Sequence, residues 1–120
     1  MLGIDPQTVF KTLIVELSNG ALAVGIIPVT KSLSLKSIAK KFSVKKATMA
    51  DPQKAQRVTG YVLGGVSPLG QKKLLKTLID VSAQAHSNIY VSAGKRGLEI
   101  QLKASDLATL CRANFANIAT

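Results

Sequence analysis

The chain has 120 residues, of which 47% are hydrophobic, and its 16 lysines and arginines against 6 acidic residues give a formal net charge of +10. A chain of this length buries about 65% of the surface that it exposes when unfolded. That is enough for one self-sufficient core, so the composition excludes a disordered basic tail and favours a single domain over residues 1–120.

The excess positive charge is confined to the middle of the sequence. Residues 31–76 contain eleven basic residues and one acidic residue, and the two kinds balance in the rest of the chain. Concentrated positive charge attracts polyanions, so nucleic acid is the first partner to expect and an anionic membrane surface the second. The absence of Trp and the scarcity of other aromatic residues disfavour the membrane. A charge that only maintains solubility is the alternative.

The single cysteine, Cys111, and the chain's hydropathy indicate a cytoplasmic setting without a membrane partner. One cysteine permits neither an internal disulfide nor a cysteine-based zinc cluster. No stretch reaches the roughly 18 to 20 apolar residues that span a bilayer, and residues 1–5 lack the layout of a signal peptide.

The first half of the chain predicts a hairpin followed by helices. Two apolar, β-branched runs, residues 9–17 and 21–27, flank Asn19-Gly20, which is a strong signal for a tight hairpin turn. Ser34 is suited to cap a helix that extends through Phe42 and turns its lysines outward. Asp51-Pro52 predicts the start of a second helix that ends at residues 59–60, and a glycine-rich connection follows at residues 61–70.

The second half predicts three strands, a helix and an edge strand. Residues 74–79, 88–92 and 98–102 are the expected strands, the last two joined by a turn at residues 93–97. Ser105 is expected to cap a helix whose apolar face carries Leu107, Leu110 and Cys111, and residues 115–118 form a closing edge strand. The fold class is therefore mixed α/β (α+β), with a mixed, mostly antiparallel sheet and short flanking helices.

Conventional catalytic groups are scarce in this sequence. His86 is the sole histidine, and its polar surroundings between two strands suggest a solvated loop residue more than the base of a triad. Cys111 is expected to pack as a small hydrophobe. The six carboxylates are scattered, so no metal site and no cofactor is expected.

Two features nevertheless suggest a binding site. The loop at residues 64–70 is rich in glycine, so its main-chain N–H groups can approach an anion or oxyanion, although it is not a Walker loop and a simple tight connection is the alternative. Lys11 is a lone charge in an apolar strand, on the same face as Val9, Leu13 and Val15 by period-two alternation. It is either an edge-strand lysine that prevents aggregation or a sheltered ammonium that faces a substrate carbonyl or phosphate.

Five segments occur in a specific order along the chain: VFKTL at 9–13, MADP at 49–52, TGY at 59–61, GGVSPLGQKK at 64–73 and IYVSAGKRGLEI at 89–100. Together they resemble the YbaK family, free-standing relatives of the editing domain inserted in bacterial prolyl-tRNA synthetases. The resemblance implies an aminoacyl-tRNA deacylase that hydrolyses mischarged Cys-tRNA(Pro). Its partners are then tRNA and prolyl-tRNA synthetase.

The resemblance also implies roles for individual residues. Lys11 corresponds to an essential strand lysine, and Glu99 stands where an aspartate is usual; both are expected to be catalytic. The expected substrate-binding residues are Gly64, Gly65, Val66, Ser67, Pro68 and Gly94. The concentration of positive charge, and not the resemblance, indicates the tRNA-binding residues, which are expected to be Lys40, Lys41, Lys45, Lys46, Lys72 and Lys73. In the family the substrate's own thiol serves as the nucleophile, which suits a chain without a conventional nucleophile–base pair.

Family members carry some tens of residues ahead of the matching region, which form a helix and a strand and contribute a tyrosine to the pocket. Here Met1 stands shortly before Lys11, so we expect a domain without that helix and strand. Ala93 and Lys76 stand where Gly and Pro are usual. Two alternatives remain: a non-catalytic tRNA-binding or synthetase-associated module, and editing of Ala-tRNA(Pro).

Overall fold

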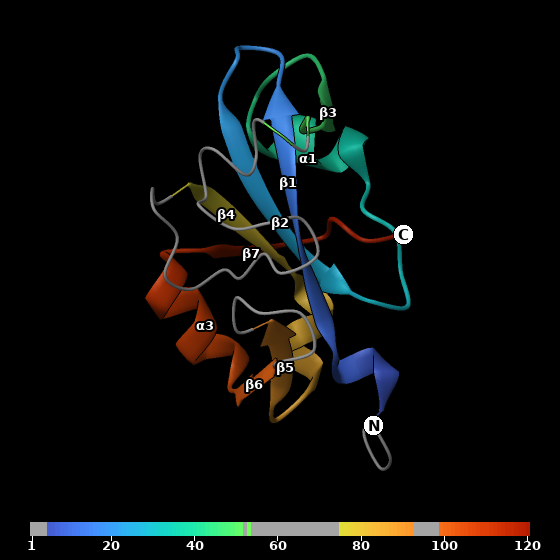
Figure 1. The fold of residues 1–120 in the computed structure, drawn as a ribbon, viewed down its shortest axis with the longest axis vertical. Coiled ribbons are helices and arrows are strands. Elements are labelled where there is room, and N and C mark those ends of the chain that lie inside the picture. The colour runs from blue at the N-terminus through green and yellow to red at the C-terminus, as the bar shows by residue number, and fades with distance from the viewer. Residues whose placement is uncertain (1–4, 52, 54–74, 93–98) are drawn as a thin grey trace.

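The computed structural model of the chain describes residues 5–51, 53, 75–92 and 99–120, and the account below concerns these residues (Figure 1). The predicted helix after Asp51, the connection at 61–70 and the turn at 93–97 lie outside them. None of the described helices is both long and apolar enough to cross a bilayer. The described elements, in chain order, are the 3₁₀ turn η1 (Pro6–Thr8), β1 (Phe10–Leu17), β2 (Leu22–Pro28), α1 (Leu35–Lys41), β3 (Ala47–Met49), β4 (Lys76–Asp80), the 3₁₀ turn η2 (Val81–Ala85), β5 (Ile89–Ser92), β6 (Glu99–Leu102), α3 (Ala104–Cys111) and β7 (Asn114–Ala116).

The predicted hairpin is confirmed as β1 and β2, which pair antiparallel from Phe10 opposite Pro28 to Glu16 opposite Leu22. Its turn depends on the Asn-Gly pair. Gly20 has a φ of +89°, a conformation that glycine adopts without steric cost. The Asn19 side-chain oxygen accepts a hydrogen bond of 3.0 Å from the backbone N–H of Ala21.

The described strands form a five-stranded sheet, with the order β3-β1-β2-β4-β7, and a separate two-stranded pair of β5 and β6. The pairings of β1 with β2 and with β3 are antiparallel, whereas β4 runs parallel to both β2 and β7. β5 and β6 pair antiparallel, as the sequence predicts. The prediction of a mixed sheet with short flanking helices is confirmed. Both parallel pairings involve β4, which lies between β2 of the hairpin and β7 near the C-terminus.

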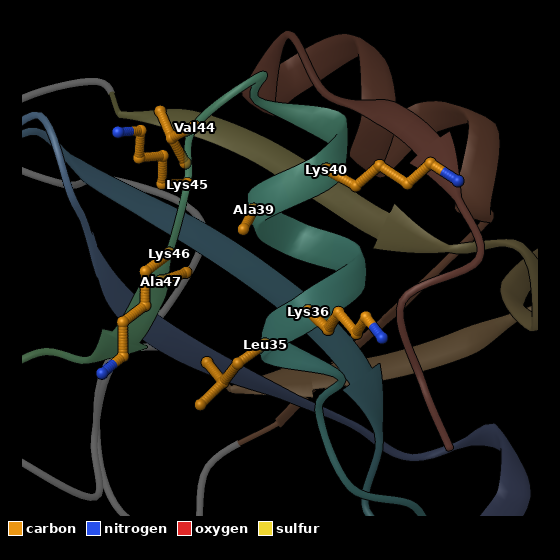
Figure 2. Close-up of a pocket in the computed structure, with 8 residues that line it drawn as sticks. All are labelled: Leu35, Lys36, Ala39, Lys40, Val44, Lys45, Lys46 and Ala47. Carbon is orange, nitrogen blue, oxygen red and sulfur yellow. The ribbon is translucent and has the colours of Figure 1, made fainter.

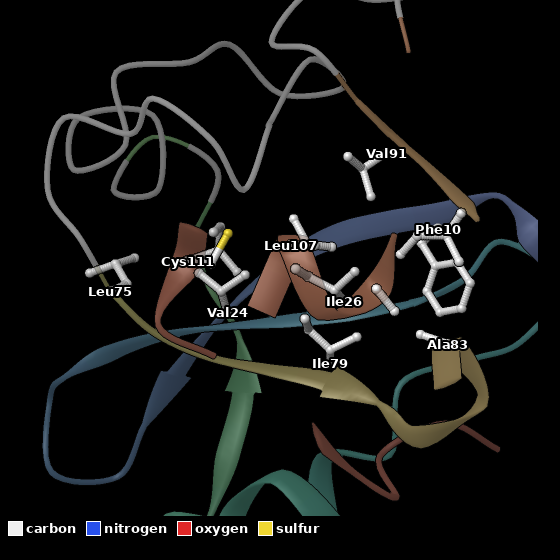
Figure 3. Close-up of a cluster of buried hydrophobic side chains, with 12 residues drawn as sticks. Phe10, Val24, Ile26, Leu75, Ile79, Ala83, Val91, Leu107 and Cys111 are labelled. Carbon is white, nitrogen blue, oxygen red and sulfur yellow. The ribbon is translucent and has the colours of Figure 1, made fainter. Parts of the chain in front are cut away.

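The core lies on both faces of the large sheet, because alternate residues of its central strands point to opposite faces. Ile26 and Ile27 are both fully buried, Ile26 in the cluster that includes Leu107 and Cys111 of α3 and Ile27 in the cluster that includes Ile38 of α1. Figure 3 shows the first, which we call the α3-side cluster, with side chains of β2, β4 and α3 packed together. The second is the α1-side cluster.

The first helix begins where the sequence predicts. The Ser34 hydroxyl accepts a hydrogen bond of 3.2 Å from the backbone N–H of Ser37, which satisfies one of the unpaired donors of the first turn. Ile38 and Ala39 are buried, and the three lysines of the helix are exposed. The amphipathic interpretation of this segment is therefore confirmed.

The start and the buried face of α3 differ from the prediction. The helix begins at Ala104, its N-cap position is Lys103, and no side chain caps it, so Ser105 is not the cap. Ala104 is buried against the α3-side cluster, and the helix starts two residues earlier than the capping pattern suggests. Leu110 is 61% exposed, because each residue turns the helix by about 100° and the core face is already defined by Ala104 and Cys111.

The C-terminal segment is fixed by a buried carboxylate at the end of β4. Asp80 accepts hydrogen bonds of 3.0 Å each from the backbone N–H groups of Ile118 and Ala119. β7 lies at the edge of the sheet beside β4, close to the predicted edge strand at 115–118. Asp80 thereby joins two parts of the chain that are distant in sequence.

Candidate functional site

Lys11 lies within β1 and is partly buried. It pairs directly with Ile27 of β2, so its side chain emerges on the face of the α1-side cluster, against which Leu13 also packs. The sheet order places β1 between β3 and β2, although β3 pairs only with residues 15–17. β1 is an inner strand of the described sheet, although β3 does not extend alongside Lys11. It is the partial burial of Lys11 that favours a sheltered ammonium.

Glu99 lies on β6, which the fold connects to β1 through β5. Glu99 pairs with Ser92 of β5, and Tyr90 of β5 forms a parallel bridge with Val9 just before β1. Ser92 and Lys11 are each two residues beyond this bridge in the same chain direction. The backbone therefore brings the strands that carry Lys11 and Glu99 to the same end of β1.

The remaining residues of the predicted pocket lie outside the described part of the chain. These are the substrate-binding residues Gly64, Gly65, Val66, Ser67, Pro68 and Gly94, and the tRNA-binding residues Lys72 and Lys73. Their roles stay predictions.

The four predicted tRNA-binding lysines that the structure describes are all exposed, and three of them line one groove. This groove, with a volume of about 480 Å³, lies between α1 and the segment that follows it (Figure 2). Lys41 is not among the lining residues of the groove, whereas Lys36 is. Lys36 precedes Lys40 by four residues, and this spacing, which places both on one face of a helix, is the sequence signal that could have identified Lys36. We call this feature the lysine groove; its lining residues are Leu35, Lys36, Ala39, Lys40, Val44, Lys45, Lys46 and Ala47.

The groove forms because the chain reverses sharply at the end of α1. Ser43 has a φ of +56°, and the backbone N–H of Val44 donates a hydrogen bond of 2.9 Å to the carbonyl oxygen of Ala39. The chain then enters β3, where Ala47 pairs with Leu17 of β1. One wall of the groove is therefore a helix, whereas Val44, Lys45 and Lys46 of the other wall lie in the connection between α1 and β3. This connection is held to the hairpin by the backbone N–H of Ser18, which donates a hydrogen bond of 2.9 Å to the carbonyl oxygen of Lys46.

His86 lines a second, polar hollow of about 410 Å³ at the opposite end of the domain. Asp5, Thr8, Tyr90 and Gln101 are among the other lining residues. His86 follows η2 as its C-cap residue and is partly buried, so it is more sheltered than a solvated loop histidine. The Asp5 carboxylate already accepts the backbone N–H of Gln7 at 2.9 Å, which caps η1.

Cys111 packs as the sequence predicts. Its side chain is 1% exposed within the α3-side cluster, and burial raises the pKa of its thiol to about 11. A thiol in this state is a poor nucleophile at neutral pH. Among the described residues, no three His, Cys, Asp or Glu side chains come close enough together to hold a metal ion.

Comparison with known proteins identifies the fold and the family. A family model described as "Aminoacyl-tRNA editing domain" matches residues 1–110. A protein of Enterococcus faecalis named "Putative Cys-tRNA(Pro)/Cys-tRNA(Cys) deacylase EbsC" is 40% identical over 119 residues, which cover 99% of this chain and 73% of the relative.

Two solved structures share the fold. One is titled "Crystal structure of a putative trans-editing enzyme for prolyl tRNA synthetase"; it has a TM-score of 0.91 and 18% identity over 99% of this chain and 74% of that one. The other, of "hypothetical protein APE2540", has a TM-score of 0.90 and 23% identity over 99% of this chain and 79% of that one. The fold agrees with the five sequence motifs and with the family match, and the chain belongs to the aminoacyl-tRNA editing domain family, the YbaK family.

Proposed function

We propose that this protein is a trans-editing deacylase that hydrolyses mischarged Cys-tRNA(Pro) in the cytoplasm. The observation that carries the proposal is the 40% identity, across 99% of the chain, to a relative named for this activity. The partial burial of Lys11 in β1 supports it, because a sheltered ammonium interacts strongly with a developing negative charge. Prolyl-tRNA synthetase is the partner that we propose to supply the mischarged tRNA.

The proposed mechanism relies on positioning. An aminoacyl ester is already activated, so holding it correctly and stabilising the oxyanion supply much of the rate. Lys11 binds the ester carbonyl or the terminal ribose-phosphate, backbone N–H groups of residues 64–67 hold the carbonyl oxygen, and Glu99 orients the substrate. The substrate thiol attacks the carbonyl carbon, the bond to the ribose oxygen breaks, and that oxygen takes the thiol proton, which leaves a cyclic thioester of cysteine. Water then adds to the carbonyl carbon, the carbon–sulfur bond breaks, the sulfur takes a proton from the water, and free cysteine results.

The first prediction concerns Lys11. We expect Lys11→Ala to lower the rate of Cys-tRNA(Pro) deacylation by about 10²- to 10³-fold, as does the loss of one group that stabilises an oxyanion. Lys11→Met, which keeps most of the side-chain volume, should be equally impaired. Lys103→Ala is the matched control, because Lys103 is exposed and its side chain does not cap α3.

Substrate identity is tested in the same assay with Cys-tRNA(Cys), Ala-tRNA(Pro) and Pro-tRNA(Pro). The relative's name includes Cys-tRNA(Cys), so this is the second candidate substrate. Faster release of alanine than of cysteine would replace the proposal with Ala-tRNA(Pro) editing. A folded wild-type protein that binds tRNA and releases no amino acid would establish the non-catalytic module.

A further inference from the structure

The lysine groove has cationic walls and an apolar floor. Figure 2 shows Lys36 and Lys40 extending from α1 to one side, and Lys45 and Lys46 extending from the following segment to the other. The other described lining residues, Leu35, Ala39, Val44 and Ala47, are aliphatic, and no carboxylate is among the described residues of the lining. The four ammonium groups extend outward on the two sides of the groove, and no described carboxylate of the lining neutralises them, so both sides attract a polyanion.

The groove is held by the core beneath it. Ile38 is fully buried and Ala39 is 6% exposed, so the helix that carries Lys36 and Lys40 is packed against the α1-side cluster. Ala47, at the other wall, belongs to the same cluster. The packing of α1 and of Ala47 fixes the backbone from which these lysines extend, which lowers the entropic cost of binding.

The chemistry of the lining indicates which part of a nucleic acid the groove contacts. Base recognition in RNA depends on stacking against aromatic or guanidinium planes and on hydrogen bonds to base edges. Among the described residues that line the groove there is no aromatic residue, no arginine and no amide side chain. Lysine acts as a point charge on phosphate, and the aliphatic floor can pack against riboses.

From this arrangement we propose that the lysine groove binds the sugar-phosphate backbone of the tRNA, without reading its sequence, and that Lys36 belongs to this site. The proposal rests on the proposed function for the identity of the polyanion. It assigns affinity for tRNA to the groove, so discrimination among tRNAs must come from elsewhere. The competing occupant is an acidic surface of a protein such as prolyl-tRNA synthetase, and the experiment below distinguishes it from tRNA.

The test compares two triple variants that change the net charge equally. The groove variant is Lys36→Gln, Lys40→Gln and Lys45→Gln; the control variant is Lys31→Gln, Lys76→Gln and Lys103→Gln, all exposed and outside the groove. Lys46 is retained because it also lines the neighbouring hollow that contains Glu16. Glutamine has nearly the helix propensity of lysine, so α1 should persist, as circular dichroism can verify.

The measurement is the dissociation constant for uncharged tRNA(Pro) and for a second, unrelated tRNA over a range of salt concentrations. For the groove variant we expect weaker binding of both tRNAs by the same factor. The slope of log K against log[salt] should fall by about 1 for each phosphate that a removed lysine had neutralised, hence by about 3. The control variant should retain a slope close to that of the wild type.

Several outcomes would overturn the proposal. Equal losses of affinity in the two variants would show that only the total charge matters, and a loss confined to one tRNA would show sequence recognition. Unchanged tRNA binding together with abolished binding of prolyl-tRNA synthetase would assign the groove to a protein. Because binding of uncharged tRNA is measured without the reaction, the groove proposal can hold even if the wild type fails to deacylate Cys-tRNA(Pro). If the groove variant deacylates Cys-tRNA(Pro) with the same KM as the wild type, the groove proposal is wrong while the proposed function still holds.

Discussion

Asp80 shows how one side chain can control the stability of the domain. It is 3% exposed, and burial alone would raise the pKa of its carboxyl group. Hydrogen bonds from the Ser82 hydroxyl and from the backbone N–H groups of Ile118, Ser82 and Ala119 outweigh burial and lower the pKa below its ordinary value. The ionised carboxylate therefore stabilises the folded state, and this contribution is complete above the pKa of the unfolded chain.

Asp80→Asn should accordingly lower the free energy of unfolding at neutral pH by about 2 kcal/mol, the usual worth of hydrogen bonds to a charged group. As the pH falls below about 3.9 and through the lowered pKa of the folded state, the wild type loses this contribution and the difference should shrink. Urea unfolding of the wild type and of the Asp80→Asn variant, from pH 7 down to pH 3, measures this difference in the free energy of unfolding. Asp106→Asn, at an exposed position in the first turn of α3, is the control. A difference that stays constant with pH would show that the charge of Asp80 is not what stabilises the fold.

Among the elements, α1 was the most predictable from sequence. Its N-cap serine, its apolar spacing and its outward lysines are all local signals, and each is confirmed. The start of α3 was missed because the signal was misleading: Ser105 resembles a cap, but burial of Ala104 extends the helix past it. A local pattern identifies a boundary only when tertiary packing does not oppose it.

Ser34→Ala should reduce the free energy of unfolding by about 1 kcal/mol, because the backbone N–H of Ser37 loses its acceptor at the first turn of α1. Ser34→Asp should restore most of that loss, since aspartate is an equally good N-cap residue. Ser32→Ala, at an exposed position two residues earlier, is the matched control for urea unfolding. If aspartate fails to rescue the alanine variant, the capping interpretation is wrong.

At the scale of the whole molecule, two core clusters share one sheet. Ile26 and Ile27 are neighbours on β2, yet they belong to the α3-side and the α1-side clusters respectively. Because the same strand supports both clusters, loosening either one should destabilise the entire domain. The two faces are therefore expected to unfold together in one cooperative transition.

Ile26→Val and Ile27→Val should each lower the free energy of unfolding by about 1 kcal/mol while leaving the slope of the urea transition unchanged. Circular dichroism and hydrogen exchange of the two faces report whether the transition stays single. Val29→Ala, at a position 42% exposed, should change stability little. Separate transitions for the two faces in either isoleucine variant would refute the shared-sheet account.

The sequence by itself determined the local elements and the family. The Asn19-Gly20 turn and the Ser34 cap depend on residues within a few positions of one another, and the concentration of lysines is visible without coordinates. The order of the five motifs was sufficient to identify the family, which the comparisons confirm. Such features are predictable because the interactions that produce them are short in range.

Only the tertiary structure decided which residues meet. It placed Lys11 on an inner strand, separated Lys41 from the groove that Lys36 lines, and turned Leu110 away from the core. It also brought the end of β4 to the C-terminal segment through Asp80. These outcomes depend on strand order and on packing between distant segments, and the free energy of such packing is not encoded in any short stretch of the chain.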